Sequence, residues 1–284
     1  MTRSASTETS LAYPNIAPTH DSAIPADVHA EIMRRLARAE AEHEVRILLA
    51  IESGSRAWGF ASPNSDYDVR FIYAHEPRWY QSVDLEERRD VIEYAIVDDI
   101  DLNGWDIRKA LRLFWKSNPA FAEWIQSPIR YIERGGFGGR ARALLPQVYS
   151  VESGMYHYRS MAKTTERTYL RNDQVSLKKY FYALRPLLSV LWLERYATPA
   201  PIEFHELLHL LDDRPALRMD IDALLERKRG APEMGLGDPV LSINAFVEEQ
   251  LMRLETMRPE ASRHPGAVPL LNALFHAVLD ESSH

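Results

Sequence analysis

The chain has 284 residues, of which 45% are hydrophobic and 26% charged, as in ordinary globular proteins. Its formal net charge of −7 excludes a global basic field, so a polynucleotide would need a local basic patch. The sequence has no cysteine, which excludes disulfides, thiolate zinc sites and a cysteine nucleophile, and it has no apolar stretch of transmembrane length.

The N-terminal region precedes the first predicted element. Residues 1–25 are rich in Ser, Thr, Pro and Ala, and we expect a mobile tail there. They lack the charged region and apolar core of a secretory signal, so we expect a cytoplasmic protein without membrane contact. From Ala26 to His43, apolar residues recur at helical spacing (Ile32, Leu36, Ala39), which predicts an amphipathic helix.

The central motif lies between two predicted strands, VRILLAIES and DYDVRFIYA. Gly54 and Ser55 follow the first strand directly, and a ten-residue spacer leads from them to Asp66 and Asp68. Strand alternation places these two carboxylates on one face, where they repel each other. Mg²⁺ bound by carboxylates and substrate phosphates would offset that charge. Gly54 allows close backbone approach, and the amides and hydroxyl near Ser55 suit a phosphate. A lone Asp-x-Asp is more often a pair of solvated acids. The prediction therefore depends on the whole combination of strand, Gly54-Ser55, spacer and Asp66-Tyr67-Asp68.

A third carboxylate is expected on an adjacent strand, because two-metal nucleotidyl transfer needs one to share both ions. The stretch DVIEYAIVDDIDLNGWD predicts one or two strands, followed by a helix over 105–116. Asp101 is our choice, because it lies mid-strand between Ile100 and Leu102. Asp99, predicted on the same face, is the alternative. Asp106 is expected to serve the start of the following helix.

The rest of the sequence is predicted to be mostly helical. Asn118 and Pro119 have the residue types of an N-cap and a first helical position. The glycine-rich run Arg134–Arg140 lacks the Lys-Ser/Thr of a P-loop and follows no clear strand, so we interpret it as a hinge or domain boundary. Further helices are expected over 141–149, 153–171, 174–196, 203–211, 218–229 and 243–257. These elements predict an α/β domain over 26–135 and an all-helical domain over 136–284.

A basic segment stands out in this otherwise acidic chain. Between residues 156 and 195 there are eight basic and three acidic residues. Lys178, Tyr182 and Arg185 recur at i, i+4 and i+7, which places them on one helical face. Facing a cleft, Lys178 and Arg185 would bind a triphosphate or a nucleic-acid backbone, with Tyr182 available to stack on a base. For the other basic residues a solvated face is the favoured interpretation.

These motifs resemble a known superfamily. Gly54-Ser55, the spacer and Asp66-Tyr67-Asp68 resemble the hG[GS]-spacer-Dh[DE]h signature of the polymerase-β-like nucleotidyltransferases. The stretch ESGSRAWGFASPNSDYDVRFIY is similar to the RlaP group, predicted nucleotidyltransferases of RNA repair pathways that were formerly grouped as YcgL-like. The similarity continues through IDLNGWDIRKALRL, SNPAFAEWIQSPIRY and LKKYFYALRPLL, from about Arg46 to Phe204.

The resemblance implies both a fold and a reaction. The fold is a small mixed sheet flanked by helices, with a helical C-terminal domain. Two Mg²⁺ ions, or Mn²⁺, would bind Asp66, Asp68 and Asp101, while Gly54 and Ser55 contact phosphate. The enzyme would transfer a nucleoside monophosphate from an NTP to a hydroxyl acceptor, an RNA end in the first instance, and release pyrophosphate.

Two alternatives remain open at this stage. A nucleotidyltransferase of this kind could modify a protein hydroxyl, as in toxin–antitoxin systems, or a small molecule. A protein of another class, a non-catalytic NTP sensor, would keep the fold without turnover, although three acids are more than such a sensor needs. The sequence does not indicate which NTP is used or what the oligomeric state is.

Overall fold

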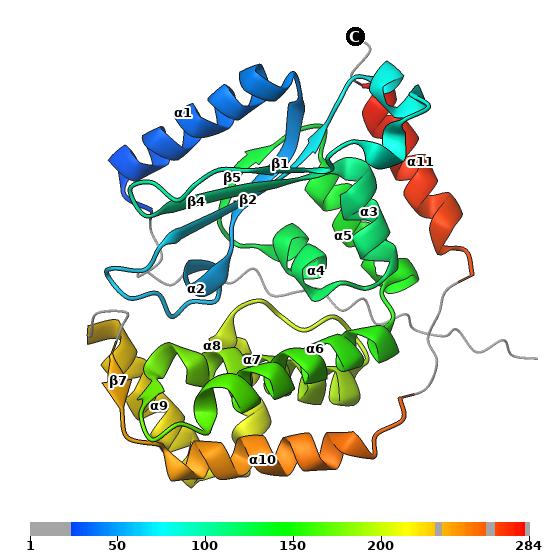
Figure 1. Ribbon diagram of the computed structural model, residues 1–284. Coiled ribbons are helices and arrows are strands. Elements are labelled where there is room, and N and C mark those ends of the chain that lie inside the picture. The colour runs from blue at the N-terminus through cyan, green and yellow to red at the C-terminus, as the bar shows by residue number, and fades with distance from the viewer. Residues whose placement is uncertain (1–23, 231–234, 260–264, 282–284) are drawn as a thin grey trace, which may run out of the picture.

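A five-stranded mixed sheet forms the centre of the N-terminal half in the computed structural model, which describes residues 24–230, 235–259 and 265–281 (Figure 1). The predicted tail over 1–25 falls almost entirely outside these residues. The strand order is β3-β4-β2-β1-β5. The strands are β1 (Arg46–Glu52), β2 (Tyr67–Ala74), β3 (Val91–Glu93), β4 (Ile100–Asp106) and β5 (Arg130–Glu133).

The pairing of these strands sets the geometry of the site. β1 pairs antiparallel with β2 and β5, and β3 pairs antiparallel with β4. β2 and β4 run parallel, with Asp68 opposite Asp101 in the register. The mixed sheet implied by the family resemblance is therefore confirmed. The short strand β5 is absent from the sequence-based prediction.

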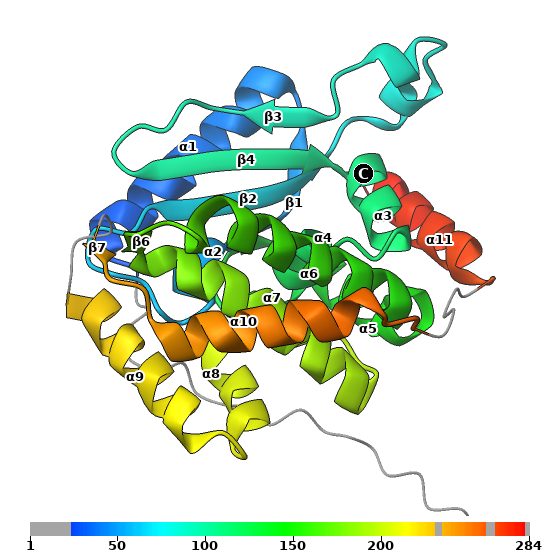
Figure 2. The same cartoon turned by 60° about the horizontal axis from the view of Figure 1, so that its bottom comes forward.

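Helices cover both faces of the sheet (Figures 1 and 2). Helix α1 (Ala26–His43) has the predicted bounds and buries Ile32, Leu36 and Ala39 against one face. The opposite face packs against α3 (Ile107–Trp115), α4 (Pro119–Gln126) and α5 (Phe137–Val148). Asn118 caps α4 as predicted, because its Oδ1 accepts from the amides of Ala120 and Phe121.

The helical lobe lies beyond α3, α4 and α5, on the side of the sheet away from α1 (Figure 1). Its helices are α6 (Val151–Thr165), α7 (Leu177–Tyr196), α8 (Phe204–Leu207), α9 (Pro215–Gly230) and α10 (Leu241–Glu255). Short elements complete the chain: α2 (Gly54–Ala57), η1 (Pro77–Gln81), η2 (Leu85–Glu87), the π-helical turn η3 (Glu166–Leu170), η4 (Leu208–Leu211), β6 (Val175–Ser176) and β7 (Leu236–Gly237). None of the helices in the described ranges is both long and apolar enough to cross a bilayer.

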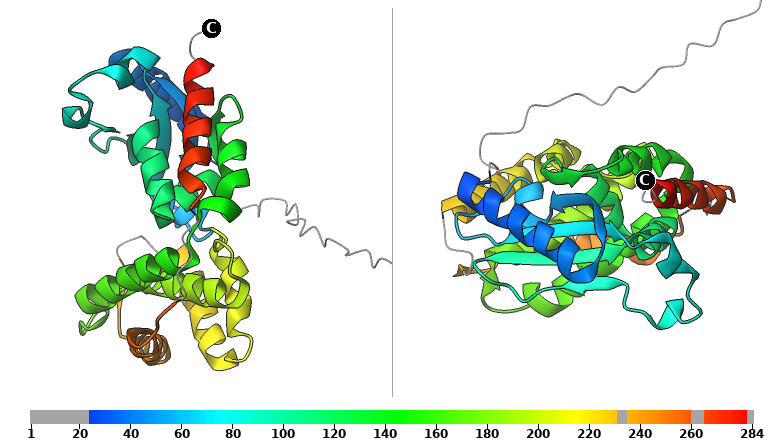
Figure 3. Two further views of the ribbon diagram at one scale, coloured as in Figure 1. Left: turned by 90° about the vertical axis from the view of Figure 1, so that its right-hand side faces the viewer. Right: turned by 90° about the horizontal axis from the view of Figure 1, so that it is seen from above.

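The division at residue 135 stays a prediction, and two helices beyond it pack with the sheet half. Helix α5 contacts α4 and β1, and α11 (Ala267–Asp280) contacts α3 and α5 (Figure 3). The glycine-rich run follows a strand, contrary to the sequence interpretation. Gly135 and Gly136 adopt φ of +57° and +61° in the turn from β5 to α5, a conformation that glycine adopts without steric cost.

The protonation of Asp106 makes the stability of the fold depend on pH. Its Oδ1 caps α3 through the Arg108 amide, and its Oδ2 accepts from the Tyr80 hydroxyl at 2.7 Å. Burial raises the pKa of Asp106 to about 6, although these hydrogen bonds act in the opposite direction. The folded protein therefore binds this proton more tightly than the unfolded chain does. The associated stability is present at low pH and is lost as the pH rises from about 4 to about 6.

We expect the free energy of unfolding of the wild-type protein to fall by about 2 kcal/mol, relative to Asp106→Asn, between pH 4 and pH 7. Asparagine keeps an acceptor for the cap but carries no titrating proton. Urea unfolding of both proteins at the two pH values measures the difference. If the free energies of unfolding of the two proteins change with pH in parallel, the proton on Asp106 does not contribute to stability.

Candidate active site

Two predicted acids meet on the sheet face that is turned toward the helical lobe. Asp68 and Asp101 are register partners on β2 and β4, and one guanidinium nitrogen joins them. Arg70 Nη2 lies 3.0 Å from Asp68 Oδ1 and 2.7 Å from Asp101 Oδ2. Asn103 also donates to Asp101, whose side chain is 20% exposed. The third carboxylate therefore lies beside the second, as predicted for Asp101.

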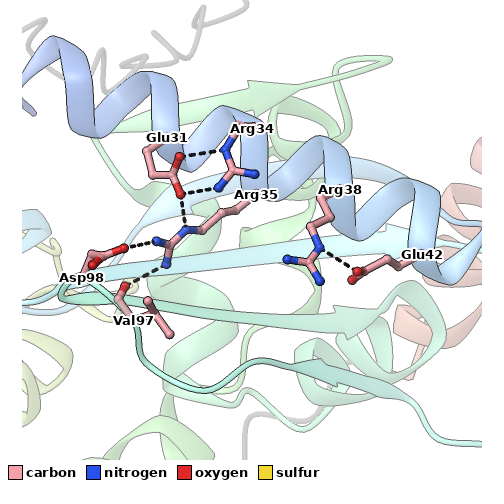
Figure 4. Close-up of polar contacts among 7 residues, drawn as sticks. All are labelled: Glu31, Arg34, Arg35, Arg38, Glu42, Val97 and Asp98. Atoms are coloured by element: carbon pink, nitrogen blue, oxygen red, sulfur yellow. Dashed lines mark hydrogen bonds and ion pairs between the residues drawn. The ribbon is translucent and has the colours of Figure 1, made fainter.

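The alternative third acid occupies a different position. Asp99 lies in an exposed turn with a left-handed φ of +59°, so strand alternation does not apply to it. Helix α1 holds this turn in place (Figure 4). Arg35 donates to the Val97 carbonyl and to Asp98 Oδ2, both at 2.7 Å. This contact orients the start of β4, on which Asp101 lies, and the geometry favours Asp101 over Asp99.

A buried arginine shapes the loop that carries Asp66. Arg56, on α2, donates to the carbonyls of Ser65 at 2.7 Å and Asp66 at 3.3 Å. Its guanidinium also stacks 3.9 Å from the Tyr67 ring centroid. These contacts fix the backbone on both sides of Asp66 and thus the entry into β2. Asp66 is close enough to Asp68 to affect its ionisation.

Gly54 lies directly against the second acid. It adopts a φ of +58°, and a Cβ built on it would overlap Asp68 Oδ2. Only glycine lets α2 approach β2 this closely. Ser55, the next residue, is buried within α2. Their contacts with phosphate remain a prediction.

We expect Gly54→Ala to destabilise the protein by about 1–3 kcal/mol more than Gly59→Ala does. Gly59 is a matched control, because its φ of +82° imposes similar backbone strain but its Cβ would meet nothing within 4 Å. Urea unfolding of the two variants isolates the overlap with Asp68. Equal losses of unfolding free energy in the two variants would show that Asp68 can move away from a Cβ at position 54 without cost.

The next acid along the site, Glu52, is fully buried at the end of β1. It accepts from the Tyr131 hydroxyl at 2.7 Å and from the Asp68 amide at 2.9 Å. Burial raises the pKa of Glu52 to about 7, and these hydrogen bonds oppose the shift. Glu52 supports the backbone beneath Asp68, a role that the sequence interpretation missed.

Charges from both halves of the molecule act on Asp68. Burial is the largest influence and raises its pKa, while Arg70 lowers it and Asp101 and Asp66 raise it. The Lys178 ammonium also lowers it, which places the start of α7 within electrostatic reach of the acids. Binding of a triphosphate by Lys178 remains a prediction.

The prediction for Arg185 requires correction. Its side chain is only 2% exposed, with Nη1 paired to Glu123 at 2.8 Å and Nε donating to the Ile202 carbonyl. The guanidinium also stacks over Trp58 at 4.7 Å. Arg185 therefore joins α7 to α4 and α2 inside the interface and does not present a free guanidinium to a phosphate. Tyr182, on the same face, packs edge-on against Trp58.

The donor set can be tested against a divalent cation. Within the described ranges, no three acidic or histidine side chains converge closely enough to hold a metal ion as they stand. Asp68 and Asp101 nevertheless present hard oxygen donors that already share one positive charge, that of Arg70. The chemistry of these donors fits Mg²⁺ or Mn²⁺. The arginine between them is the second feature that the sequence interpretation missed, although alternation places Arg70 on the face of Asp66 and Asp68.

The chain is similar to known proteins over most of its length. Residues 28–277 match the model of RlaP, described as the RNA repair pathway DNA polymerase beta family. The uncharacterized protein YcgL of Bacillus subtilis strain 168 is 44% identical over 251 residues, covering 88% of this chain and 96% of that protein. A nucleotidyltransferase-like protein from Exiguobacterium sibiricum 255-15 is 12% identical, with a TM-score of 0.32 over 89% of this chain and 90% of its own. The chain belongs to the RlaP family of polymerase-β-like nucleotidyltransferases, which is named for an RNA repair pathway.

Proposed function

We propose that the protein is a Mg²⁺-dependent nucleotidyltransferase that moves a nucleoside monophosphate from an NTP to the hydroxyl of an RNA end. The observation that carries this proposal is the side-by-side placement of Asp68 and Asp101 on β2 and β4. The RNA acceptor is proposed from the family to which the chain belongs. Protein and small-molecule hydroxyls remain alternative acceptors.

The proposed reaction is one displacement at phosphorus. The acceptor oxygen forms a bond to the α-phosphorus, the bond to the bridging oxygen breaks, and pyrophosphate leaves with that oxygen. Bound Mg²⁺ would supply charge neutralisation and lower the pKa of the acceptor hydroxyl. Asp66, Asp68 and Asp101 would hold the ions. The acceptor proton passes to solvent.

Residues from both halves would bind the triphosphate. Gly54 and Ser55 offer the amides of α2, and Lys178 brings a positive charge from α7 toward the same acids. A cation near the leaving pyrophosphate stabilises the charge that develops there. The contacts of the half-buried Trp58 ring with Tyr182 and Arg185 hold the end of α2 against α7, which favours a preformed site.

Incubation with each α-labelled NTP, Mg²⁺ or Mn²⁺ and RNAs of defined ends tests the proposal. We expect labelled RNA and an equal amount of pyrophosphate. A labelled protein or small molecule in place of RNA would change the acceptor and keep the chemistry. Saturable NTP binding without pyrophosphate from any acceptor would overturn the proposal in favour of a nucleotide sensor.

A further inference from the structure

A nitrogen of the Arg70 guanidinium lies between the two acids Asp68 and Asp101. Its Nη2 contacts Asp68 and Asp101 at 3.0 and 2.7 Å. Its Nη1 is held separately, 2.8 Å from the Asp101 carbonyl and 3.1 Å from the Val69 carbonyl. Only one end of the guanidinium is thus engaged with the carboxylates.

The Arg70 guanidinium forms an ion pair with both carboxylates. Asp68 and Asp101 thus share its single positive charge, while Lys178 and Asp66 act on Asp68 with opposite signs. A divalent ion would neutralise the pair more completely. An ion bound to the two oxygens that Nη2 now contacts, at metal–oxygen distances of roughly 2.0–2.1 Å, would leave no room for Nη2 between them. On those two oxygens the ion and Nη2 would therefore exclude each other.

We propose that Arg70 is the resident counter-cation of Asp68 and Asp101, and that a divalent ion enters only by displacing its Nη2 group. This inference rests on the proposed function, which places the ion on these two carboxylates. The Nη1 contacts with main-chain carbonyls keep the displaced guanidinium beside the ion. Repulsion between the displaced guanidinium and the ion weakens binding of a metal ion alone. The negative phosphates of an incoming NTP offset this repulsion. Arg70 thereby couples loading of the metal to binding of the nucleotide.

Binding of Mn²⁺ alone, without nucleotide, tests the proposal in Arg70→Gln and in the wild-type protein. We expect the variant to bind Mn²⁺ at least ten-fold more tightly, measured by the loss of the free-ion paramagnetic resonance signal. Its thermal midpoint should also rise more on addition of Mn²⁺ than that of the wild type. Arg38→Gln is the matched control: it removes the same charge from an exposed pair with Glu42 on α1, and we expect unchanged Mn²⁺ affinity.

If Arg70 instead preorganised the two acids for the metal ion, Arg70→Gln would bind Mn²⁺ more weakly than the wild type. Equal or weaker Mn²⁺ binding by Arg70→Gln would overturn the proposal, as would tight binding that persists in Arg70→Gln/Asp101→Asn. The proposed function is judged separately by transfer to RNA in the wild-type protein. If the wild-type protein transfers nucleotide to RNA but Arg70→Gln has unchanged Mn²⁺ affinity, only the inference about Arg70 is wrong. If the wild-type protein transfers nucleotide to no acceptor, the proposed function is wrong.

A measurement on the unmodified protein covers the case in which Arg70→Gln does not fold. In protein labelled with ¹⁵N-arginine, the Arg70 guanidinium signal, assigned with Arg70→Lys, should shift when Mg²⁺ and a non-hydrolysable NTP are added together. Mg²⁺ alone should shift it less at the same concentration. A signal that does not respond to the two together would overturn the displacement.

Discussion

Asp101→Asn is expected to lower nucleotidyl transfer by about a thousand-fold and to leave NTP binding largely intact. The substitution removes the negative charge that lies opposite Asp68 on β4 and keeps the size of the side chain. Gly54, Ser55 and Lys178, the groups proposed to bind the triphosphate, are unchanged. Single-turnover transfer and calorimetry with a non-hydrolysable NTP measure the two effects separately.

The neighbouring acid gives a matched control. Asp99→Asn removes the same charge two residues away, in the exposed turn, and asparagine tolerates the left-handed backbone there. We expect near-normal transfer from this variant. Loss of activity in Asp99→Asn with normal activity in Asp101→Asn would exchange their roles. Loss of NTP binding in Asp101→Asn would contradict the prediction for that variant, because it would show that Asp101 is needed to bind the nucleotide.

Glu123→Gln is expected to destabilise the protein by about 3–5 kcal/mol, because it leaves the Arg185 guanidinium buried without its counter-charge. Glu123 accepts from Arg185, from the Tyr158 hydroxyl and from the Trp58 indole, so it joins α4 to α2, α6 and α7. Both charged side chains are almost completely buried. Equilibrium unfolding in urea measures the loss.

A double substitution separates the ion pair from simple packing. Glu123→Leu/Arg185→Leu replaces the buried charges with apolar groups, and we expect it to be more stable than Glu123→Gln. Arg185 Nη2 has no hydrogen-bond partner among the described residues, so the pair is incompletely satisfied as it stands. Arg38→Ala, at an exposed pair, should have little effect. A loss below about 1 kcal/mol in Glu123→Gln would contradict the role of this pair in joining the two halves.

Local patterns predicted much of the N-terminal half. Helical spacing predicted α1 with its correct bounds, and two apolar runs predicted β1 and β2. These features depend on neighbouring residues in the sequence, which is why periodicity reveals them. The parallel register that places Asp101 beside Asp68 is a long-range feature, and the choice over Asp99 followed from its position mid-strand.

The errors have a common physical origin. Lys178 and Arg185 share a helical face, and periodicity identified that face correctly. It could not show that α4 pairs Arg185 with a buried acid, Glu123, while Lys178 is near enough to Asp68 to lower its pKa. The sequence also lacks a local signal for the return of α11 to the sheet half, because that packing joins residues far apart in the chain.

The most direct test of the account is a crystal structure with Mn²⁺ and a non-hydrolysable NTP, in which anomalous scattering locates the ion. We expect Mn²⁺ bound by Asp68 and Asp101, the triphosphate between α2 and Lys178, and Arg70 Nη2 withdrawn from both carboxylates. An ion bound away from these acids, or a triphosphate that does not reach them, would contradict the catalytic assignment.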